Sequence, residues 1–302
     1  MSIAKRIILI FLIILISSST YAGEFKVAVV KSDGLLPYDE VIAGFRAELQ
    51  GQSIRLIFVD GVDNRSTLAA KISAIRPAAI LCIGTKALES VSDIKNIPKI
   101  FCLVTLSKAY TLVNRQDVYG VVIDIPHAIQ FKIIKTAFPK VKRIGVIYNP
   151  EHNQKLIVEA EKSAHAMGFR LIAIQVHSIK AIPSALQKLE NRIDLLWSIY
   201  DQTVYGPETA KYILLFTLRK NIPFVGFSPQ FAKAGALLSL YGDHRDMGRQ
   251  AALIAIKILN DEIPAPKRTE PRKTRIAINE KVAKALEISL PDYFLKTADK
   301  IY

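Results

Sequence analysis

Two copies of one short pattern constrain the fold of this chain more than any other feature. The second copy, residues 142–172, reads KRIGVIYNPEHNQKLIVEAEKSAHAMGFRLI. Its run 143–147 is apolar and partly β-branched, which predicts a buried strand. The proline after Asn149 favours extended geometry there, and Gly168 favours a helix end. The stretch therefore predicts a βαβ unit with a polar loop at the carboxyl end of its first strand.

The same unit follows the first 22 residues. It consists of a strand at 26–30, a polar loop at 31–37, a helix at 39–49 and a strand at 54–59. The two units begin 117 residues apart, and strand-like and helix-like runs alternate throughout the chain. This alternation predicts α/β architecture with parallel sheets, in which ligands bind beyond the carboxyl ends of the strands. We expect two Rossmann-like lobes with a ligand cleft between them.

Length and charge are compatible with a two-lobed binding protein. A chain of 302 residues accommodates two domains of ordinary size, and its 50% apolar content supplies their cores. The formal net charge is +14, but the basic residues are spread out and not clustered with aromatic side chains. We therefore expect no nucleic-acid partner.

Residues 1–22 have the pattern of a secretory signal peptide. Lys5 and Arg6 precede an unbroken apolar run at 7–16, and Ala22 is a small residue suited to cleavage. The apolar run is short for a membrane span, although an uncleaved anchor is the alternative. No cysteine follows the signal to carry a lipid, so we expect a protein of the periplasm, whose net charge without residues 1–22 is +12.

The cysteines and histidines predict neither a cofactor nor a metal site. Cys82 and Cys102 each lie in an apolar run that predicts a buried strand. An oxidising compartment permits a disulfide, but neighbouring parallel strands rarely offer bridging geometry, so we expect two buried thiols. The five histidines are scattered and show no metal-ligand spacing.

No sequence motif predicts catalysis. The chain lacks a Gly-x-Ser-x-Gly elbow, a phosphate-binding loop and a Gly-x-Gly-x-x-Gly turn after the first strand. Instead, aromatic, amide and hydroxyl side chains and one carboxylate follow the predicted strands. They are Tyr38, Thr85, Thr105, Tyr148, Asn149, Asn153, Tyr200, Asp201, Phe227 and Tyr241. Such a set can bind a small polar or zwitterionic molecule without transforming it, so we expect a protein that is not an enzyme.

Two features of these strand ends have alternative interpretations. Gly84 and Thr85 lie between a predicted strand and a helix, where free N–H groups suit an anion such as a carboxylate. Ordinary helix capping by Thr85 is the alternative. Trp197, the only tryptophan, lies within a strand-like run, which favours a core position over stacking on a ligand.

Several segments, in their order and spacing, resemble the solute-binding proteins of ABC transporters with the type I periplasmic-binding fold. Within that family the chain is most similar to the subgroup associated with tryptophan and tyrosine uptake. The segments are IGTKA at 83–87, YGV at 119–121, FPKVKRIGVIYNP at 138–150, IPFVGF at 222–227 and GRQAA at 248–252.

The resemblance implies two lobes joined by about three crossing strands. Lobe 1 would comprise 23–124 and about 242–268, and lobe 2 would comprise 125–241 and about 269–302. The hinge residues would be Asp124, Tyr241 and Gly242.

The resemblance also implies the ligand contacts. Asp201 would meet an ammonium group, and the Gly84–Thr85 turn would meet a carboxylate. The polar contacts would be Thr85, Thr105, Asn149, Asn153 and Asp201, and the apolar walls Tyr38, Tyr148, Tyr200 and Phe227. The chain departs from the family at Thr105-Leu106-Ser107, where Thr-Asp-Pro is usual, and in its first loop, which lacks a His-Pro pair.

The resulting functional hypothesis is an extracytoplasmic ABC solute-binding protein. It would close its lobes on a small polar ligand, an aromatic or other amino acid, and deliver it to a membrane permease working with an ATPase. We expect a monomer that contacts the permease directly. The alternative is a periplasmic sensor coupled to a membrane histidine kinase or cyclase.

Overall fold

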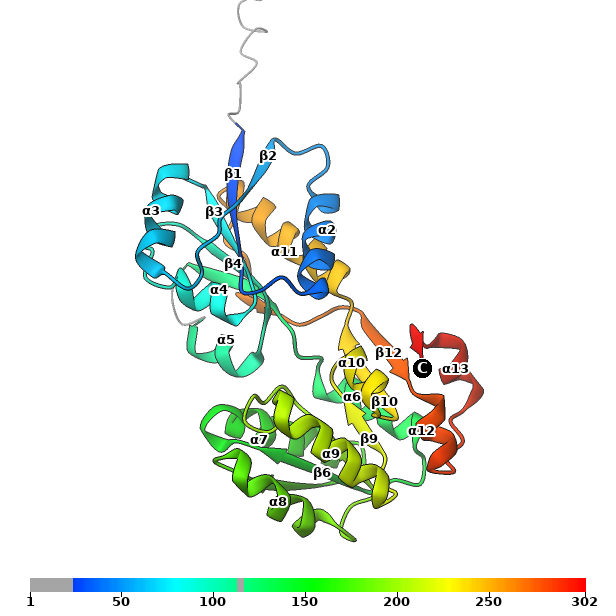
Figure 1. Ribbon diagram of the computed structural model, residues 1–302. Helices are drawn as coiled ribbons and strands as arrows, with labels where there is room; N and C mark the ends of the chain where they lie inside the picture. The colour runs from blue at the N-terminus through cyan, green and yellow to red at the C-terminus, as the bar shows by residue number, and fades with distance from the viewer. Residues whose placement is uncertain (1–23, 113–116) are drawn as a thin grey trace, which may run out of the picture.

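The structure, a computed structural model, describes residues 24–112 and 117–302. The predicted signal peptide lies outside these residues. Figure 1 shows two α/β lobes stacked end to end and joined by several chain segments. Among the described residues, no helix has the length and apolarity needed to cross a membrane. The prediction of a two-lobed α/β fold is confirmed.

Lobe 1, the upper lobe in Figure 1, contains a six-stranded parallel sheet in the order β11-β5-β4-β3-β1-β2. Its strands are β1 (Phe25–Lys31), β2 (Ile54–Phe58), β3 (Ala79–Ile83), β4 (Lys99–Val104), β5 (Val118–Val122) and β11 (Arg268–Thr269). Its helices are α2 (Leu36–Glu48), α3 (Arg65–Ile75), α4 (Thr85–Ser90), α5 (Leu106–Leu112) and α11 (His244–Leu259). The two central strands β3 and β4 are buried along their whole length, as expected for a sheet covered on both faces.

Helices α2 and α11 pack closely because each presents a glycine to the other. A Cβ atom on Gly44 would lie 1.8 Å from the Arg245 carbonyl oxygen, and one on Gly248 would lie 2.0 Å from that of Val41. Only hydrogen fits at these two points. Helix α11 follows β10 of lobe 2 in the chain. The two glycines allow it to pack against α2 and so to become part of lobe 1.

Lobe 2 contains a seven-stranded sheet in the order β13-β12-β10-β9-β8-β6-β7. Its strands are β6 (Arg143–Tyr148), β7 (Arg170–Gln175), β8 (Leu195–Trp197), β9 (Phe224–Gly226), β10 (Leu238–Gly242), β12 (Thr274–Ile278) and β13 (Lys300–Ile301). Its helices are α6 (His127–Ala137), α7 (Pro150–Ala166), a 3-10 turn η1 (Ile179–Ala181), α8 (Ile182–Leu189), α9 (Pro207–Arg219), α10 (Pro229–Ala234), α12 (Glu280–Ala285) and α13 (Asp292–Thr297). Strand β12 pairs antiparallel with β10, while the other pairs are parallel.

The carboxyl-terminal segment 291–302 forms α13 and β13, and β13 pairs with β12. Leu106 and Ser107 belong to α5. One local expectation needs correction. Helix α2 begins at Leu36 and not at Asp39, since Pro37 occupies its first turn, where the missing N–H has no helical acceptor. By contrast, Cys82 and Cys102 are buried free thiols, as expected.

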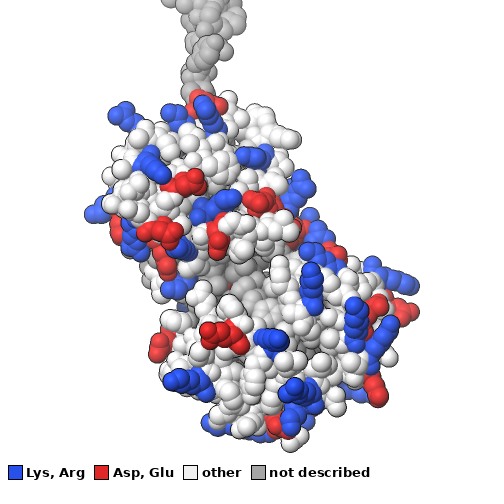
Figure 2. All heavy atoms as spheres, in the orientation of Figure 1, with Lys and Arg blue, Asp and Glu red and all other residues white. Residues whose placement is uncertain are grey.

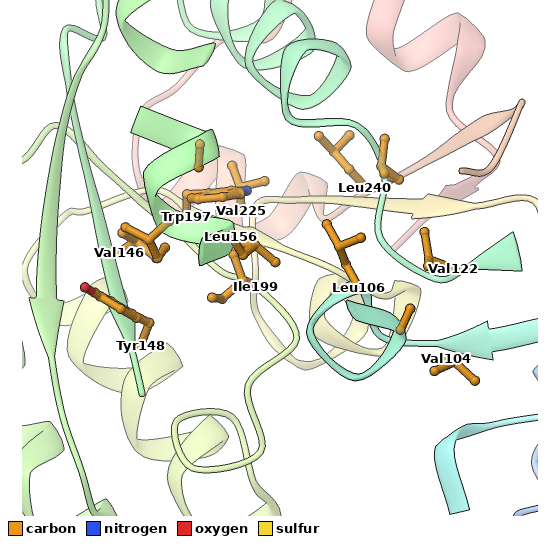
Figure 3. Packing of buried hydrophobic residues seen from close by; sticks show 14 of the residues in the cluster. Val104, Leu106, Val122, Val146, Tyr148, Leu156, Trp197, Ile199, Val225 and Leu240 are labelled. Atoms are coloured by element: carbon orange, nitrogen blue, oxygen red, sulfur yellow. The ribbon is translucent and has the colours of Figure 1, made fainter. Parts of the chain in front are cut away.

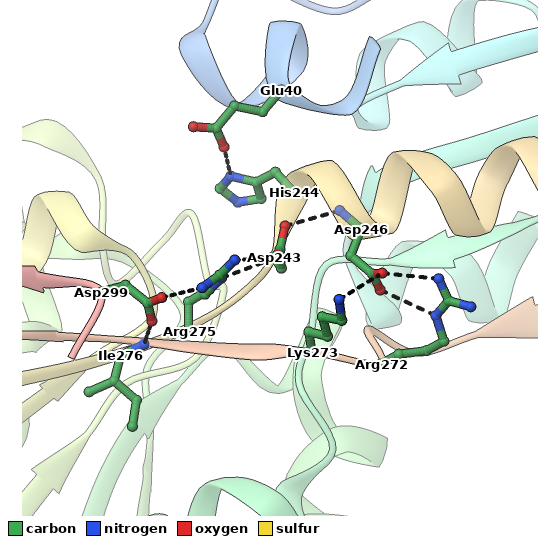
Figure 4. Close-up of polar contacts among 9 residues, drawn as sticks. All are labelled: Glu40, Asp243, His244, Asp246, Arg272, Lys273, Arg275, Ile276 and Asp299. Carbon is green, nitrogen blue, oxygen red and sulfur yellow. Dashed lines mark hydrogen bonds and ion pairs between the residues drawn. The ribbon is translucent and has the colours of Figure 1, made fainter. Parts of the chain in front are cut away.

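The chain passes between the sheets three times, after β5, β10 and β11. Ionic contacts tie two of these passages together (Figure 4). The Asp243 carboxylate caps α11 and pairs with Arg275 of β12 at 2.6 Å, and Arg275 also pairs with Asp299. One turn further along α11, Asp246 accepts two hydrogen bonds from Arg272, at 3.0 and 3.2 Å.

A hydrophobic cluster continues from lobe 1 into lobe 2 beside these passages. Figure 3 shows its side chains as one band from Val104 and Val122 to Trp197. Trp197 is 1% exposed, packs against Phe131 at 5.1 Å between ring centroids and donates its indole N–H to Gln130 Oε1 at 2.9 Å. Trp197 is therefore a core residue, as the strand pattern predicts.

Candidate functional site

A cleft of about 520 Å³ lies between the lobes, at the carboxyl ends of β3, β4, β8 and β9. Figure 2 shows the molecule hollowed at this level, with acidic and basic side chains interspersed around it. Lobe 1 contributes Thr85, Lys86, Glu89, Thr105, Ser107 and Lys108. Lobe 2 contributes His152, Asn153, Tyr200, Asp201, Gln202, Tyr205 and Phe227.

Asp201 organises the lobe 2 wall. Its Oδ1 accepts hydrogen bonds from the backbone N–H groups of Thr203 and Val204, at 3.0 and 3.1 Å. Its Oδ2 accepts from the Asn149 N–H at 2.6 Å and from Asn153 Nδ2 at 2.9 Å. A carboxylate offers about four acceptor positions, so Asp201 is fully used within lobe 2. Although it lines the cleft, its first role is to hold the loop at 201–204 against Asn149 and Asn153.

Asn149 is likewise occupied inside the lobe. It caps α7 through a hydrogen bond from the Glu151 N–H at 3.0 Å, and its Nδ2 donates to Thr203 Oγ1 at 3.0 Å. The side chain is 4% exposed and is not part of the cleft lining. Its amide therefore shapes the loop that carries Asp201.

Asn153, which belongs to the cleft lining, carries an unused hydrogen-bond acceptor. Its Nδ2 group donates to Asp201, which orients the amide and turns Oδ1 away from the carboxylate. Asn153 is 2% exposed, and within the described residues its Oδ1 has no hydrogen-bond partner. Buried acceptors in folded proteins are normally paired, so this oxygen has the character of a ligand contact.

Aromatic rings form the rest of the lobe 2 wall. The rings of Tyr200 and Phe227 lie 4.2 Å apart between centroids, and the Tyr200 hydroxyl donates to the Phe227 carbonyl at 3.0 Å. Tyr205 meets the Phe227 ring edge-on at 5.8 Å. This wall provides ring faces and edges against which a flat apolar group can pack.

The lobe 1 wall is built from the first turns of two short helices. Gly84 precedes α4 with φ of 91°, and a Cβ there would lie 2.5 Å from Ser32 Oγ and 2.7 Å from the Tyr38 hydroxyl oxygen. Ser32 Oγ in turn accepts from the Ala87 N–H at 2.8 Å, so Thr85 is not the side-chain cap of this helix. At the start of the neighbouring α5, the hydroxyl oxygens of Thr105, which precedes the helix, and of Ser107 lie 3.3 Å apart.

The lysines of this wall are already paired with acids. Lys108 contacts Glu89 at 3.1 Å, and Lys86 contacts Asp63. Their side chains are 44% and 56% exposed, so water reaches both cations in this arrangement of the lobes.

The structure brings together six of the residues expected in the site from the sequence, namely Thr85, Thr105, Asn153, Tyr200, Asp201 and Phe227. Four others lie outside the lining: Tyr38, Gly84, Tyr148 and Asn149. Tyr148 points elsewhere, since its hydroxyl donates to Gln154 and accepts from Gln175. Sequence reasoning missed Lys86, Glu89, Ser107, Lys108, His152, Gln202 and Tyr205. Several of the missed residues lie next to an expected residue in the sequence or one helical turn away from it. Including such neighbours of the expected residues would have identified them.

A small second cavity at the junction of the lobes contains Asp124, with Trp197 and Tyr200 among its neighbours. Asp124 Oδ2 accepts from the Leu106 N–H at 2.5 Å. Burial raises the pKa of this carboxyl to about 6, against the opposing effect of that hydrogen bond. The other expected hinge residues, Tyr241 and Gly242, end β10, and Tyr241 is 7% exposed.

A direct contact joins the lobes beside the cleft, which we call the α5–α7 latch (Tyr110, Glu159, Lys155 and Arg268). The Tyr110 hydroxyl of lobe 1 lies 2.9 and 2.8 Å from the two carboxylate oxygens of Glu159 in lobe 2. Lys155 Nζ lies 3.8 Å from the Tyr110 ring centroid, and Arg268 Cζ lies 4.5 Å from it. Burial, followed by the bond to Glu159, raises the pKa of Tyr110 to about 12.

Within residues 24–112 and 117–302, no group of three or more His, Cys, Asp or Glu side chains is placed to hold a metal ion. The cleft combines one unused acceptor, hydroxyl groups and aromatic rings. This arrangement can bind a small amphiphilic molecule and enclose it between two walls.

Comparison with known proteins gives consistent results. The family model described as ABC transporter substrate binding protein matches residues 39–302. The tyrosine-binding protein of Clostridioides difficile strain R20291 is 25% identical over 253 residues, which span 79% of this chain and 72% of that protein.

Solved structures share the fold. An ABC domain from Streptococcus pneumonia in complex with L-Trp has a TM-score of 0.69 and 21% identity, over 93% of this chain and 100% of that one. The ligand-free, open structure of a substrate binding protein with adhesive properties from Clostridium difficile has a TM-score of 0.73 and 22% identity, over 91% of this chain and 98% of that one.

Proposed function

We propose, from the premise that this chain belongs to the ABC transporter substrate-binding protein family, that its cleft binds an aromatic amino acid. The relative named a tyrosine-binding protein and the fold neighbour in complex with L-Trp support this ligand class. The observation that carries the proposal is the unused Asn153 Oδ1 on the same wall as the Tyr200 and Phe227 rings.

Each part of the ligand has a matching group. The ammonium donates to Asn153 Oδ1, and the negative charge of Asp201, one hydrogen bond away, favours a cation there. The aromatic side chain packs on Tyr200 and Phe227. The carboxylate accepts from the hydroxyls of Thr105 and Ser107 on lobe 1. The ligand thereby connects both walls.

Lobe closure is the step that completes the site. In the open form the ligand rests on lobe 2, and rotation of lobe 1 brings its hydroxyls to the carboxylate and buries the ligand. The closed shape is then recognised by an ABC permease, which works with an ATPase, and the ligand is released unchanged. Residues 1–22 direct the protein to the periplasm, where it acts as a monomer.

The test is calorimetric titration of the chain from Gly23 with L-tyrosine and L-tryptophan. Loss of the Asn153 acceptor in Asn153→Ala should weaken binding by about tenfold or more, the equivalent of one hydrogen bond to a charged group. The matched control is Thr203→Ala, which removes a hydrogen bond to Asn149 in the same loop but lies outside the cleft lining. Equal affinities for wild type and Asn153→Ala would contradict the proposal.

A further inference from the structure

Tyr205 carries a buried hydroxyl that nothing in the described part of the protein satisfies. Three buried side-chain polar atoms there have no hydrogen-bond partner: Asn153 Oδ1, the Tyr205 hydroxyl oxygen and Ser239 Oγ. Asn153 and Tyr205 both line the cleft, whereas Ser239 lies in the middle of β10. Tyr205 is 9% exposed, and its hydroxyl is shielded from water. Leaving a buried hydroxyl without a hydrogen-bond partner destabilises a protein, so a partner is expected.

The surroundings of Tyr205 would suit a phenylalanine equally well if packing were its only role. Its ring meets Phe227 at 5.8 Å and Phe231 at 6.0 Å, both edge-on, and Phe224 at 6.1 Å. Its backbone N–H donates to the Asp201 carbonyl at 2.8 Å, which fixes its position. The hydroxyl is therefore the one polar atom of a side chain placed among aromatic rings.

The side chain of Tyr205 borders two spaces. It lines the cleft, and it also lines a groove of about 610 Å³ between α9 and α10. Burial, reinforced by the nearby Asp201 carboxylate, raises the pKa of the Tyr205 phenol. The group stays neutral and can both donate and accept a hydrogen bond.

We infer that Tyr205 determines specificity: its hydroxyl hydrogen-bonds to a polar group on the ligand's aromatic ring. The cleft consequently prefers rings that carry a hydroxyl or an N–H, as in tyrosine or tryptophan, over a plain phenyl ring. This inference rests on the proposed function and deepens it. A site built to pair with such a group rejects an analogue that lacks it, because the protein's own polar atom is then left unpaired.

The test compares the dissociation constants of L-tyrosine, L-tryptophan and L-phenylalanine for wild type and for Tyr205→Phe. Wild type should bind L-tyrosine or L-tryptophan about tenfold or more tighter than L-phenylalanine. In Tyr205→Phe that ratio should fall to within about threefold, with the affinity for L-phenylalanine kept. Tyr212→Phe is the matched control, since Tyr212 is 45% exposed on α9 and outside the cleft lining, and its ratio should equal that of wild type.

Two results separate failure of the inference from failure of the proposed function. Equal binding of all three amino acids by wild type, or an unchanged ratio in Tyr205→Phe, overturns the inference alone. Binding of none of them by wild type overturns the proposed function, and the inference with it. A melting temperature also serves as a check: ligand-free Tyr205→Phe should melt no lower than wild type, and a marked fall would reveal an internal partner and overturn the inference.

Discussion

The two walls of the cleft differ in how far they are organised before a ligand arrives. On lobe 2, Asn153 and Asp201 are 2% and 5% exposed and belong to one hydrogen-bond network. On lobe 1, Lys86 and Lys108 are 56% and 44% exposed and face the cleft beside small hydroxyl side chains. Lobe 2 thus holds its polar and aromatic side chains in place through hydrogen bonds and packing. The side chains of the lobe 1 wall are more exposed and can adjust to a ligand.

This difference suggests an order of events. A preorganised, desolvated wall binds a ligand with little loss of side-chain entropy, so we propose that lobe 2 is the initial docking surface. The solvated wall of lobe 1, which is built from short helices, can contact the ligand in a later step, when the lobes rotate. The α5–α7 latch and the hydrophobic band at the junction join the two walls in the arrangement that the structure shows.

The largest effect is expected from a substitution of Asp201, the residue that organises the lobe 2 wall. Asp201→Ala leaves four donors without their acceptor, three of them backbone N–H groups. We expect a loss of about 4 kcal/mol in the free energy of unfolding, and no measurable ligand binding. Urea denaturation measures the free energy of unfolding, and calorimetry measures ligand binding. Thr105→Ala on lobe 1 should cost less than about 0.5 kcal/mol, and similar losses for both variants would remove the contrast.

The junction between the walls should show a pH dependence. Because the pKa of Asp124 is about 6 in the folded protein and 3.8 ordinarily, the folded state binds this proton more tightly. Its contribution to stability is therefore complete below pH 3.8 and is lost as the pH rises through 6, a change of about 3 kcal/mol. In Asp124→Asn this part of the profile should disappear.

Urea unfolding of wild type and Asp124→Asn at several pH values between 4 and 7 measures this difference. Asp39→Asn is the control, because Asp39 is exposed on lobe 1 and should leave the profile unchanged. Parallel profiles for wild type and Asp124→Asn would show that the carboxyl titrates normally.

A smaller effect is expected at the latch. Tyr110→Phe keeps the ring between lobes but removes the hydroxyl that contacts Glu159. Unfolding should become easier by about 1 kcal/mol, and hydrogen exchange should increase in α5 and α7. Unchanged exchange in both helices would mean that the hydroxyl contributes nothing to joining the lobes.

The smallest change in stability is expected for a substitution in the exposed lobe 1 wall. Lys108→Ala breaks an ion pair with Glu89 in which both side chains are at least 36% exposed. Such pairs contribute little, so the free energy of unfolding should change by less than about 0.5 kcal/mol. A loss of 2 kcal/mol or more would show that this wall is as firmly organised as the other one.

The sequence predicted the two-lobed fold and part of the site for a common reason. Apolar runs followed by polar loops locate the carboxyl ends of parallel strands, and Thr85, Thr105 and Asp201 each follow such a run closely. Tyr148 shows the limit of this reasoning. It ends β6 but faces Gln154 and Gln175, and the run of apolar residues before it does not indicate which face of the sheet its side chain takes.

Other features depend on tertiary contacts that leave no local pattern. Tyr205 lies in a turn before α9, and only the packing of Phe224, Phe227 and Phe231 around it marks it as part of the wall. Strand β13 has two residues, too few for a periodic signal, and exists because β12 offers it an edge.

The central claim, that lobe 2 docks the ligand and lobe 1 closes over it, is tested most directly by stopped-flow binding of L-tyrosine. We predict that Asn153→Ala, on lobe 2, abolishes or strongly slows the initial association. Ser107→Ala, on lobe 1, should keep the wild-type association rate and only raise the dissociation rate. The reverse assignment of these two effects would contradict the account.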